Sequence, residues 1–318
     1  MDKPYVVGMD MGGTNTVFGI VDVRGNVISK AAIKTDTHQD INLYVQDIYK
    51  ELIKLIDAAG GISKIKGIGV GAPNGNYYSG NIEFAPNLNW RGVIPFANIM
   101  SEKFGIPAVL TNDANAAAIG EMTYGAARGM KNFIMITLGT GVGSGIVIDG
   151  KLVYGHDGFA GELGHTCSVR NNGRQCGCGK TGCLETYASA NGVAKTAREI
   201  LETRQDESML RNIPAESVTS KDVHDAALQG DRVALEIFEF TGKILGEALA
   251  DFVAFSAPEA IILFGGLTKS GDFILKPIID HMERNLLAIW KGKIKVLFSD
   301  LKEADAAVLG ASALAWEI

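Results

Sequence analysis

The order of apolar and polar residues predicts strands and helices that alternate along most of the chain. Short apolar or alternating runs predict strands at Tyr5–Asp10, Val17–Val23, Val27–Ile33, Ile65–Val70, Ala108–Thr111, Asn132–Leu138, Ala260–Phe264 and Ile294–Ser299. Apolar residues at helical spacing predict helices over Ile41–Ala58, Ala116–Tyr124, Ala188–Leu201, Ser220–Leu228, Arg232–Ser256 and Asp305–Trp316. In the helix 232–256, the small residues Gly242, Gly246 and Ala250 allow close packing, either in the core or against a second copy.

Two glycine-rich turns lie between predicted strands. The first is Asp10-Met11-Gly12-Gly13-Thr14, and the second runs from Gly139 through Thr140, Gly141 and Gly143 to Gly145. Glycines let backbone N–H groups approach phosphate oxygens, and Thr14 adds a hydroxyl donor. Asp10 could hold Mg²⁺ through water. The first turn alone would equally suit an ordinary hairpin, but two matching turns indicate a duplicated lobe with phosphates bound between its halves.

Three of the four cysteines fall within eight positions and form a candidate zinc site. They are Cys176, Cys178 and Cys183, and His165 stands eleven positions before the first of them. Three cysteines and one histidine are a common ligand set for structural Zn²⁺. Cys167 is the rival to His165 as fourth ligand, and a chance cluster of small buried side chains is the alternative to a metal site.

Polar residues near these motifs could read a ligand rich in hydroxyl groups. Glu162 and Glu185 bracket the cysteine cluster, and carboxylates accept hydrogen bonds from hydroxyls. Asn87 offers both a donor and an acceptor, although a turn asparagine is an equally good explanation. Asp113 follows a predicted strand and begins a helix, where it could be a helix N-cap or a general base.

Length, charge and cysteine use limit the class of protein. A chain of 318 residues with 47% hydrophobic content is long enough for two lobes with separate cores. A net charge of −6 argues against non-specific binding to nucleic acid. The sequence has no leader-like start and no apolar run of bilayer length, so we expect a cytoplasmic protein without a membrane partner. The few cysteines fit a reducing compartment.

The cysteine region resembles the signature of a known family. Gly161-Glu162-Leu163-Gly164-His165, Cys176-Gly177-Cys178-Gly179 and Gly182-Cys183-Leu184-Glu185 are similar to the motif of the ROK family of sugar kinases and repressors. The resemblance implies an α/β, two-lobed actin-like ATPase (ribonuclease H-like) fold, with a mixed sheet flanked by helices in each lobe and a ligand cleft between the lobes. It places residues 1–112 and 303–318 in a small lobe and residues 113–302 in a large one.

The same resemblance implies a kinase that phosphorylates a hexose at its 6-hydroxyl, with ATP and Mg²⁺ as cofactors, a structural Zn²⁺, and glucose as the expected substrate. The alternatives are a kinase for mannose, fructose, allose, N-acetylglucosamine or N-acetylmannosamine, polyphosphate as donor, and a sugar-responsive regulator or sensor. A homodimer or tetramer is expected, with no nucleic-acid partner. Family members often have glycine where Asn74 stands.

The implied site residues fall into four sets. Asp113 is the general base. The sugar-binding residues are Gly71, Asn87, Asn112, Asp113, Glu162, His165 and Glu185. The ATP-binding residues are Asp10, Gly12, Gly13, Thr14, Gly139, Thr140, Gly141, Gly143, Gly265 and Gly266. The metal ligands are His165, Cys176, Cys178 and Cys183.

Overall fold

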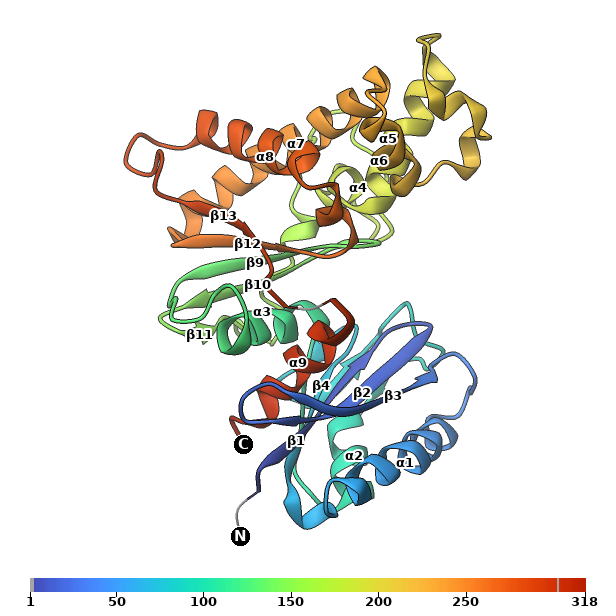
Figure 1. Ribbon diagram of the computed structural model, residues 1–318, viewed down its shortest axis with the longest axis vertical. Coiled ribbons are helices and arrows are strands. Elements are labelled where there is room, and N and C mark those ends of the chain that lie inside the picture. The colour runs from blue at the N-terminus through green and yellow to red at the C-terminus, as the bar shows by residue number, and fades with distance from the viewer. Residues whose placement is uncertain (1–2, 302) are drawn as a thin grey trace. The chain divides into compact units, whose positions relative to one another are not determined.

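The computed structural model describes residues 3–301 and 303–318 and confirms a mixture of sheets and helices (Figure 1). The chain divides into two compact units. Unit 1 comprises residues 1–131, 145–161 and 299–318, and unit 2 comprises residues 132–144 and 162–298. Unit 1 extends past the predicted lobe boundary at residue 112, because the helix that begins there packs on other elements of unit 1. Residues 1–2 and 302 of the predicted lobes lie outside the described residues.

Unit 1 is built on a mixed sheet of five strands in the order β3-β2-β1-β4-β8. The strands are β1 (Tyr5–Met11), β2 (Asn15–Asp22), β3 (Val27–Lys34), β4 (Ile65–Gly71) and β8 (Ala108–Thr111). The first three are antiparallel neighbours, whereas β4 lies parallel to both β1 and β8. A parallel arrangement places the carboxyl ends of β1, β4 and β8 at one edge of the sheet, where ligands bind in open α/β sheets.

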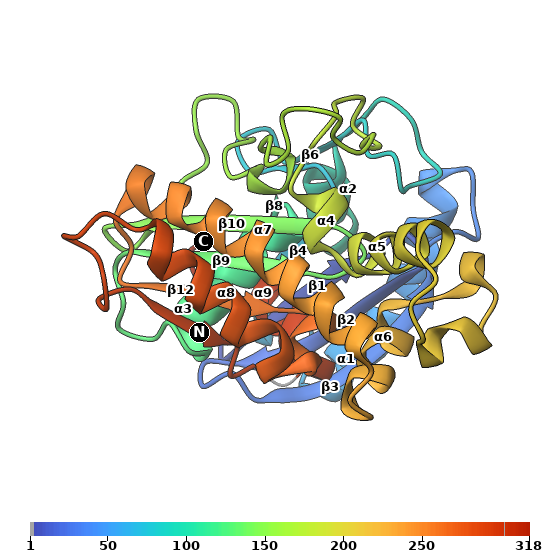
Figure 2. The same cartoon turned by 90° about the horizontal axis from the view of Figure 1, so that it is seen from above.

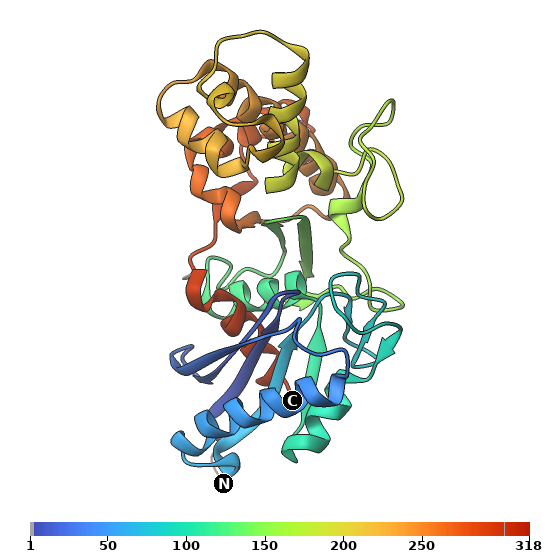
Figure 3. The same ribbon diagram turned by 90° about the vertical axis from the view of Figure 1, so that its right-hand side faces the viewer.

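Helices cover both faces of this sheet (Figure 3). They are α1 (Ile41–Ala58), α2 (Phe96–Phe104), α3 (Asp113–Tyr124) and α9 (Glu303–Ala315). Alternate residues of β1 point to opposite faces. Val7 and Met9 belong to the core under α1 and α2, while Val6 packs with Val308 of α9. The strand is therefore buried on both sides.

Two glycines allow α9 to lie very close to the strands. A Cβ at Gly8 of β1 would stand 2.0 Å from the carbonyl oxygen of Val308, and one at Gly69 of β4 would stand 2.0 Å from that of Ala311. Any larger residue would push the helix away from the sheet. The close approach explains why glycines interrupt two otherwise apolar strands.

A small antiparallel sheet and a hairpin complete unit 1. The small sheet contains β5 (Gly75–Asn76), β6 (Asn81–Glu83) and β7 (Val93–Ile94). The last residues of β10 (Val142–Ile148) pair with β11 (Lys151–Leu152). The hydrophobic pattern did not predict these short strands, nor the nine-residue helix α2.

Unit 2 has a sheet in the order β10-β9-β12-β13, to which β10 contributes residues 142–144. Its other strands are β9 (Phe133–Leu138), β12 (Ala260–Phe264) and β13 (Lys295–Phe298). Its helices are α4 (Glu185–Ala188), α5 (Ala190–Thr203), α6 (Ser220–Leu228), α7 (Arg232–Ser256) and α8 (Asp272–Asn285). Apolar residues of β9, β12, α5, α7 and α8 share one core.

Helices α7 and α8 lie along each other (Figure 2). A Cβ at Gly242 would stand 2.4 Å from Cβ of Pro277, and one at Gly246 would stand 2.5 Å from the carbonyl oxygen of Ile278. The small residues of α7 therefore serve the core, one of the two uses that the sequence left open. No helix within the described ranges is both long and apolar enough to cross a membrane.

Candidate functional site

Four predicted site positions of unit 1 meet at one edge of its sheet. Asp10 of β1 is the register partner of Gly71 at the end of β4, and Gly71 is the partner of Thr111 at the end of β8. Asn112 and Asp113 follow directly. A Cβ at Gly71 would stand 3.7 Å from Oδ1 of Asp10 and 3.6 Å from Cα of Asp113. The structure thus brings together residues that are far apart in the sequence.

The two carboxyl groups at this edge have raised pKa values. Burial, and then the charge of Asp113, raise the pKa of Asp10 to about 7. Burial also raises the pKa of Asp113, against the opposing effect of a hydrogen bond from the N–H of Ala114 at 2.8 Å. Asp113 is nevertheless reachable from solvent. An accessible carboxyl group with a raised pKa is suited to accept a proton near neutral pH.

Replacing Asp10 by asparagine should stabilise the ligand-free protein at high pH. The pKa of Asp10 is about 7 in the folded state, against 3.8 as the ordinary value. Below about pH 4, Asp10 is protonated in both the folded and the unfolded protein. Between about pH 4 and pH 7 it ionises more readily in the unfolded protein, so the free energy of unfolding falls as the pH rises. The three-unit difference corresponds to about 4 kcal/mol at most. Asp10→Asn should therefore raise Tm at pH 8 by several degrees and leave it unchanged at pH 4.

Thermal unfolding of both proteins at the two pH values, with EDTA present, measures this effect. Asp36→Asn, at an exposed position in the loop after β3, is the matched control and should leave Tm at pH 8 unchanged. An Asp10→Asn protein that unfolds at or below the wild-type temperature at pH 8 would contradict the expectation.

Asn112 is the N-cap of α3. Its side-chain oxygen accepts a hydrogen bond of 2.6 Å from the N–H of Asn115. The N-cap alternative for Asp113 is therefore wrong, because Asp113 is the first residue inside the helix. The cap occupies the oxygen of Asn112, so a hydroxyl ligand would meet its NH₂ group.

The first glycine turn connects β1 to β2 and lies against the loop that carries Asn87. The N–H of Gly12 donates to the carbonyl oxygen of Asn15 at 3.0 Å. A Cβ at Gly13 would stand 2.9 Å from the backbone oxygen of Asn87, so only glycine fits without displacing that loop. Thr14 is exposed and could donate its hydroxyl to a ligand.

In unit 2, the second glycine turn is held by Glu185 and α5. The N–H of Val142 donates to Oε2 of Glu185 at 3.0 Å, and the N–H of Ala190 donates to the oxygen of Gly139 at 2.9 Å. A Cβ at Gly141 would clash with Oε2 of Glu185 at 2.2 Å. One carboxylate oxygen of Glu185, a residue predicted to bind the sugar, thus already accepts a hydrogen bond from the turn.

Gly265 comes to the same place from the end of β12. Its φ of 108° is a conformation that favours glycine, and a Cβ there would stand 2.7 Å from the carbonyl oxygen of Leu138. Since Gly139 follows Leu138, the predicted nucleoside turn at Gly265 and Gly266 lies beside the second phosphate turn.

A cavity of about 150 Å³ next to this turn adds residues that sequence reasoning missed. Thr140 and Glu185 line it together with Gln175, Thr186, Ser189, Asn191, Gly192 and Lys195. Ser189 is the N-cap of α5, and its oxygen accepts from the N–H of Gly192 at 3.0 Å. A serine before an amphipathic run was the available signal for this helix start.

The four predicted metal ligands gather in unit 2. One ligand atom from each of His165, Cys176, Cys178 and Cys183 lies within 4.8 Å of all the others. Sγ of Cys178 and Sγ of Cys183 are 3.7 Å apart, and Sγ of Cys176 is 3.7 Å from Nδ1 of His165. Zn–S bonds of about 2.3 Å in a tetrahedron place two sulfurs about 3.8 Å apart, so the group fits Zn²⁺. Cys167 is not part of it and is exposed.

His165 has one ring nitrogen toward the cysteines and the other toward a carboxylate. Nδ1 faces Cys176, whereas Nε2 lies 3.9 Å from Oε2 of Glu162. This orientation leaves Nδ1 to bind a metal and Nε2 to donate a hydrogen bond. Two residues that are predicted to bind the sugar, His165 and Glu162, therefore lie side by side at the start of the cysteine loop.

Arg174 connects the cysteine loop to helices α4 and α5. Its guanidinium donates to the carbonyl oxygen of Thr186 at 2.8 Å and to Oε2 of Glu199 at 2.5 Å, and it lies over the ring of Tyr187. The sequence gave no sign of this role, because its partners lie up to 25 positions away.

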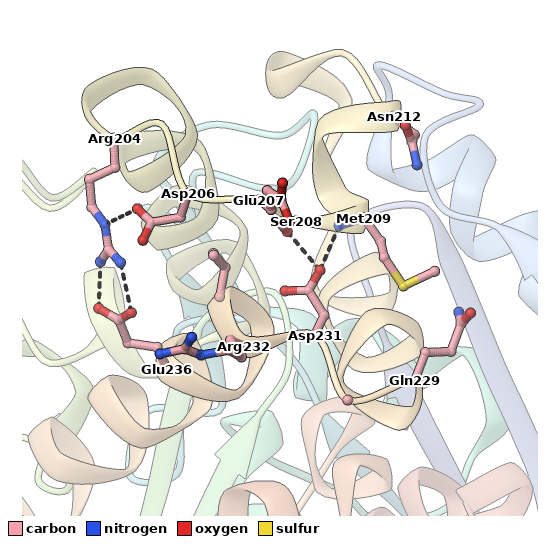
Figure 4. A pocket seen from close by; sticks show the side chains of 12 residues that line it. Arg204, Asp206, Glu207, Ser208, Met209, Asn212, Gln229, Asp231, Arg232 and Glu236 are labelled. Carbon is pink, nitrogen blue, oxygen red and sulfur yellow. Dashed lines mark hydrogen bonds and ion pairs between the residues drawn. The ribbon is translucent and has the colours of Figure 1, made fainter.

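A larger cavity of unit 2, of about 940 Å³, contains no predicted site residue (Figure 4). Arg204 binds both oxygens of Glu236, at 2.5 and 3.0 Å, and also Asp206 at 2.7 Å. Asp231 accepts from Ser208 and from the N–H of Met209. These charged groups satisfy one another, so we assign no ligand to this cavity.

Comparison with known proteins agrees with the motifs. A family model described as the ROK family matches residues 6–318. A glucokinase of Halalkalibacterium halodurans is 38% identical over 286 residues, covering 89% of this chain and 86% of that protein. The xylose repressor of Caldicellulosiruptor bescii is 29% identical over 316 residues, covering 98% of this chain and 78% of the repressor.

A solved structure extends the likeness to the fold. The crystal structure of a ROK family glucokinase from Streptomyces griseus, in complex with glucose and AMPPNP, matches with a TM-score of 0.79 and 33% identity, over 99% of this chain and 100% of that one. The predicted actin-like fold is thereby confirmed. Since the family model spans nearly the entire sequence, this protein belongs to the ROK family.

Proposed function

We propose that the protein is a kinase that transfers the γ-phosphoryl group of ATP to the 6-hydroxyl of a hexose, with glucose as the preferred sugar. The observation that carries the proposal is the carboxyl group of Asp113, accessible and with a raised pKa, at the sheet edge beside Asp10 and Gly71. The likeness to glucokinases and to a structure that holds glucose and AMPPNP supports the substrate pair.

Asp113 would act as the general base. Its carboxylate accepts the proton of the 6-hydroxyl while that oxygen forms a bond to the γ-phosphorus, and the bond from phosphorus to the bridging oxygen of ADP breaks. Asp10 lies close by, and burial together with the charge of Asp113 raises its pKa to about 7, so a cation beside it would stabilise its ionised form. Mg²⁺ would neutralise charge on the phosphates, and Asp10 is the residue of unit 1 placed to hold it through water.

Each unit contains groups that could form hydrogen bonds with the hydroxyls of a sugar. In unit 1 these are the NH₂ of Asn112 and the side chain of Asn87. In unit 2 they are Glu162, Nε2 of His165 and Oε1 of Glu185, whose Oε2 is already bound to the second turn. Each of these two sets has both donors and acceptors, as a polyhydroxyl ligand requires.

The nucleotide would be bound by backbone groups of the glycine turns. Gly12, Gly13 and Thr14 offer N–H and hydroxyl donors in unit 1. The turn from Gly139 to Gly143 does so in unit 2, next to the N-terminus of α5, whose positive end favours phosphate. Gly265 and Gly266 would lie along the nucleoside. Zn²⁺ held by His165 and the three cysteines would be structural.

The test is an assay of ADP release with Mg-ATP against glucose, mannose, fructose, allose, N-acetylglucosamine and N-acetylmannosamine. The proposal expects one sugar to dominate, with glucose giving the highest kcat/KM. If no sugar raises ADP release above the background rate of ATP hydrolysis, the kinase function is overturned. If another sugar gives the highest kcat/KM, the choice of glucose is wrong.

We also propose a cytoplasmic homodimer, which light scattering and fractionation of cells would check.

A sugar-responsive regulator is the second candidate, because the chain is similar to a xylose repressor. Binding of a sugar without turnover in the same assay would favour it over the kinase.

A further inference from the structure

Asn74 has a left-handed backbone and a side chain that binds two carbonyl groups. Its φ is 51°, a region that asparagine tolerates better than other side chains. Its NH₂ group donates to the oxygens of Glu83 at 2.9 Å and Phe84 at 3.4 Å. Its backbone carbonyl oxygen accepts from the N–H of Glu83 at 3.1 Å, a bond that does not involve the side chain. Glycine would permit the same backbone but could make neither side-chain bond.

The segment that Asn74 holds is a closed loop, Phe84–Gly92. The N–H of Phe84 donates to the oxygen of Gly92 at 2.8 Å and closes the loop. Inside it Leu88 and Trp90 are buried, and the ring of Trp90 lies 4.6 Å from that of Tyr44. The closing hydrogen bond and the packing of Leu88 and Trp90 hold the loop together, and Asn74 contacts it where it begins.

That beginning is strained. Phe84 has a φ of 52°, an outlier for a bulky residue, although its side chain is 71% exposed and gains little from burial. A residue keeps such a conformation only when its surroundings fix it. The hydrogen bond from Asn74 to the carbonyl oxygen of Phe84 is such a constraint.

The loop carries Asn87, and Asn74 stands three positions after Gly71. Asn87 already lies so close to Gly13 that a single Cβ would not fit between them, so a small rotation of the loop would move its side chain away from the first glycine turn. Asn74 is thus the link between two predicted sugar-binding positions of unit 1.

We propose that Asn74 is a positioning residue for sugar binding: it fixes the Phe84–Gly92 loop and thereby the place of Asn87. The inference rests on the proposed sugar-binding function.

The test compares Asn74→Gly and Asn74→Asp with wild type. Asn74→Gly keeps the backbone and loses the amide; Asn74→Asp keeps the size but opposes a carboxylate to two carbonyl oxygens. Both should raise the KM and Kd for the sugar about 3- to 10-fold, the loss expected for one or two hydrogen bonds, and leave the KM for ATP within twofold. Hydrogen exchange at the Phe84 amide should become faster.

Asp149→Gly is the matched control, because Asp149 also has a left-handed backbone, with a φ of 51°, and is exposed in the turn between β10 and β11. It should leave the sugar KM unchanged. An unchanged sugar Kd in Asn74→Gly, or an equal rise in the KM for ATP, would overturn the positioning role while wild type still binds sugar. Wild-type protein that binds no sugar in calorimetry would overturn the proposed function and this inference together.

Discussion

Asp113→Asn should lower kcat for the preferred sugar by about 10²- to 10⁴-fold, the usual contribution of a positioned general base. Asparagine keeps the size of the side chain and the start of α3, whose cap is Asn112, but it cannot take up the hydroxyl proton. The KM for the sugar should therefore change little. Measurement of ADP release at saturating ATP and sugar gives the ratio.

The pH dependence separates a base from a merely structural carboxylate. The pKa of Asp113 is raised by burial, so the wild-type rate should fall on acidification at a pH above the ordinary range of a carboxyl group. The residual rate of Asp113→Asn should lack this limb. Loss of activity together with an equal loss of sugar binding, or a variant with wild-type kcat, would contradict the assignment.

Removal of the zinc ligands should have the second largest effect. The double variant Cys176→Ser/Cys178→Ser should lose the metal, about one Zn²⁺ per chain in wild type, and its activity should fall by about 100-fold. The cysteine loop contains His165 at one end and leads to Glu185 at the other. Without Zn²⁺ to hold the loop, both residues lose their positions. Elemental analysis and the sugar KM measure the two effects.

Cys167→Ser is the matched control. Cys167 is exposed, donates weakly to the oxygen of Val169 at 3.7 Å and stands outside the cluster, so this variant should retain its zinc and its activity. A loss of zinc in Cys167→Ser equal to that of the double variant would assign the fourth ligand to Cys167. Full activity in a zinc-free double variant would exclude a role of the metal in sugar binding.

The fold could be predicted wherever burial leaves a regular pattern. The central strands and α7 are apolar at the spacing of a strand or a helix, and the structure has them within a few residues of the predicted bounds. Helix α2 was missed because it begins after Pro95 without a side-chain N-cap, whereas α6, which is equally short, has the capping box of Thr219 and Asp222. Helix α8 was missed because Pro277 lies inside it, and proline usually ends a helix; here it packs against Gly242 instead.

The candidate site could be predicted in part for a similar reason. The metal group is local, so the spacing of Cys176, Cys178 and Cys183 carries it. The cluster of Asp10, Gly71 and Asp113 depends on the strand order β1-β4-β8, which no local pattern contains. Asn74 and Arg174 act through side-chain hydrogen bonds to residues that lie farther along the chain. The sequence does not show which residues come close to them in the folded protein.

The helix that closes one face of the first sheet follows the strands that it covers after most of the sequence. Roughly 290 residues separate β1 from α9, so at about 5–20 residues per second the face that bears Val6 and Val21 waits about 15–60 s on the ribosome for its cover. The middle of the chain contains all of unit 2, which is complete before unit 1. The first sheet can therefore be completed only after α9 has been synthesised, and until then the apolar face of β1 and β2 lacks this cover.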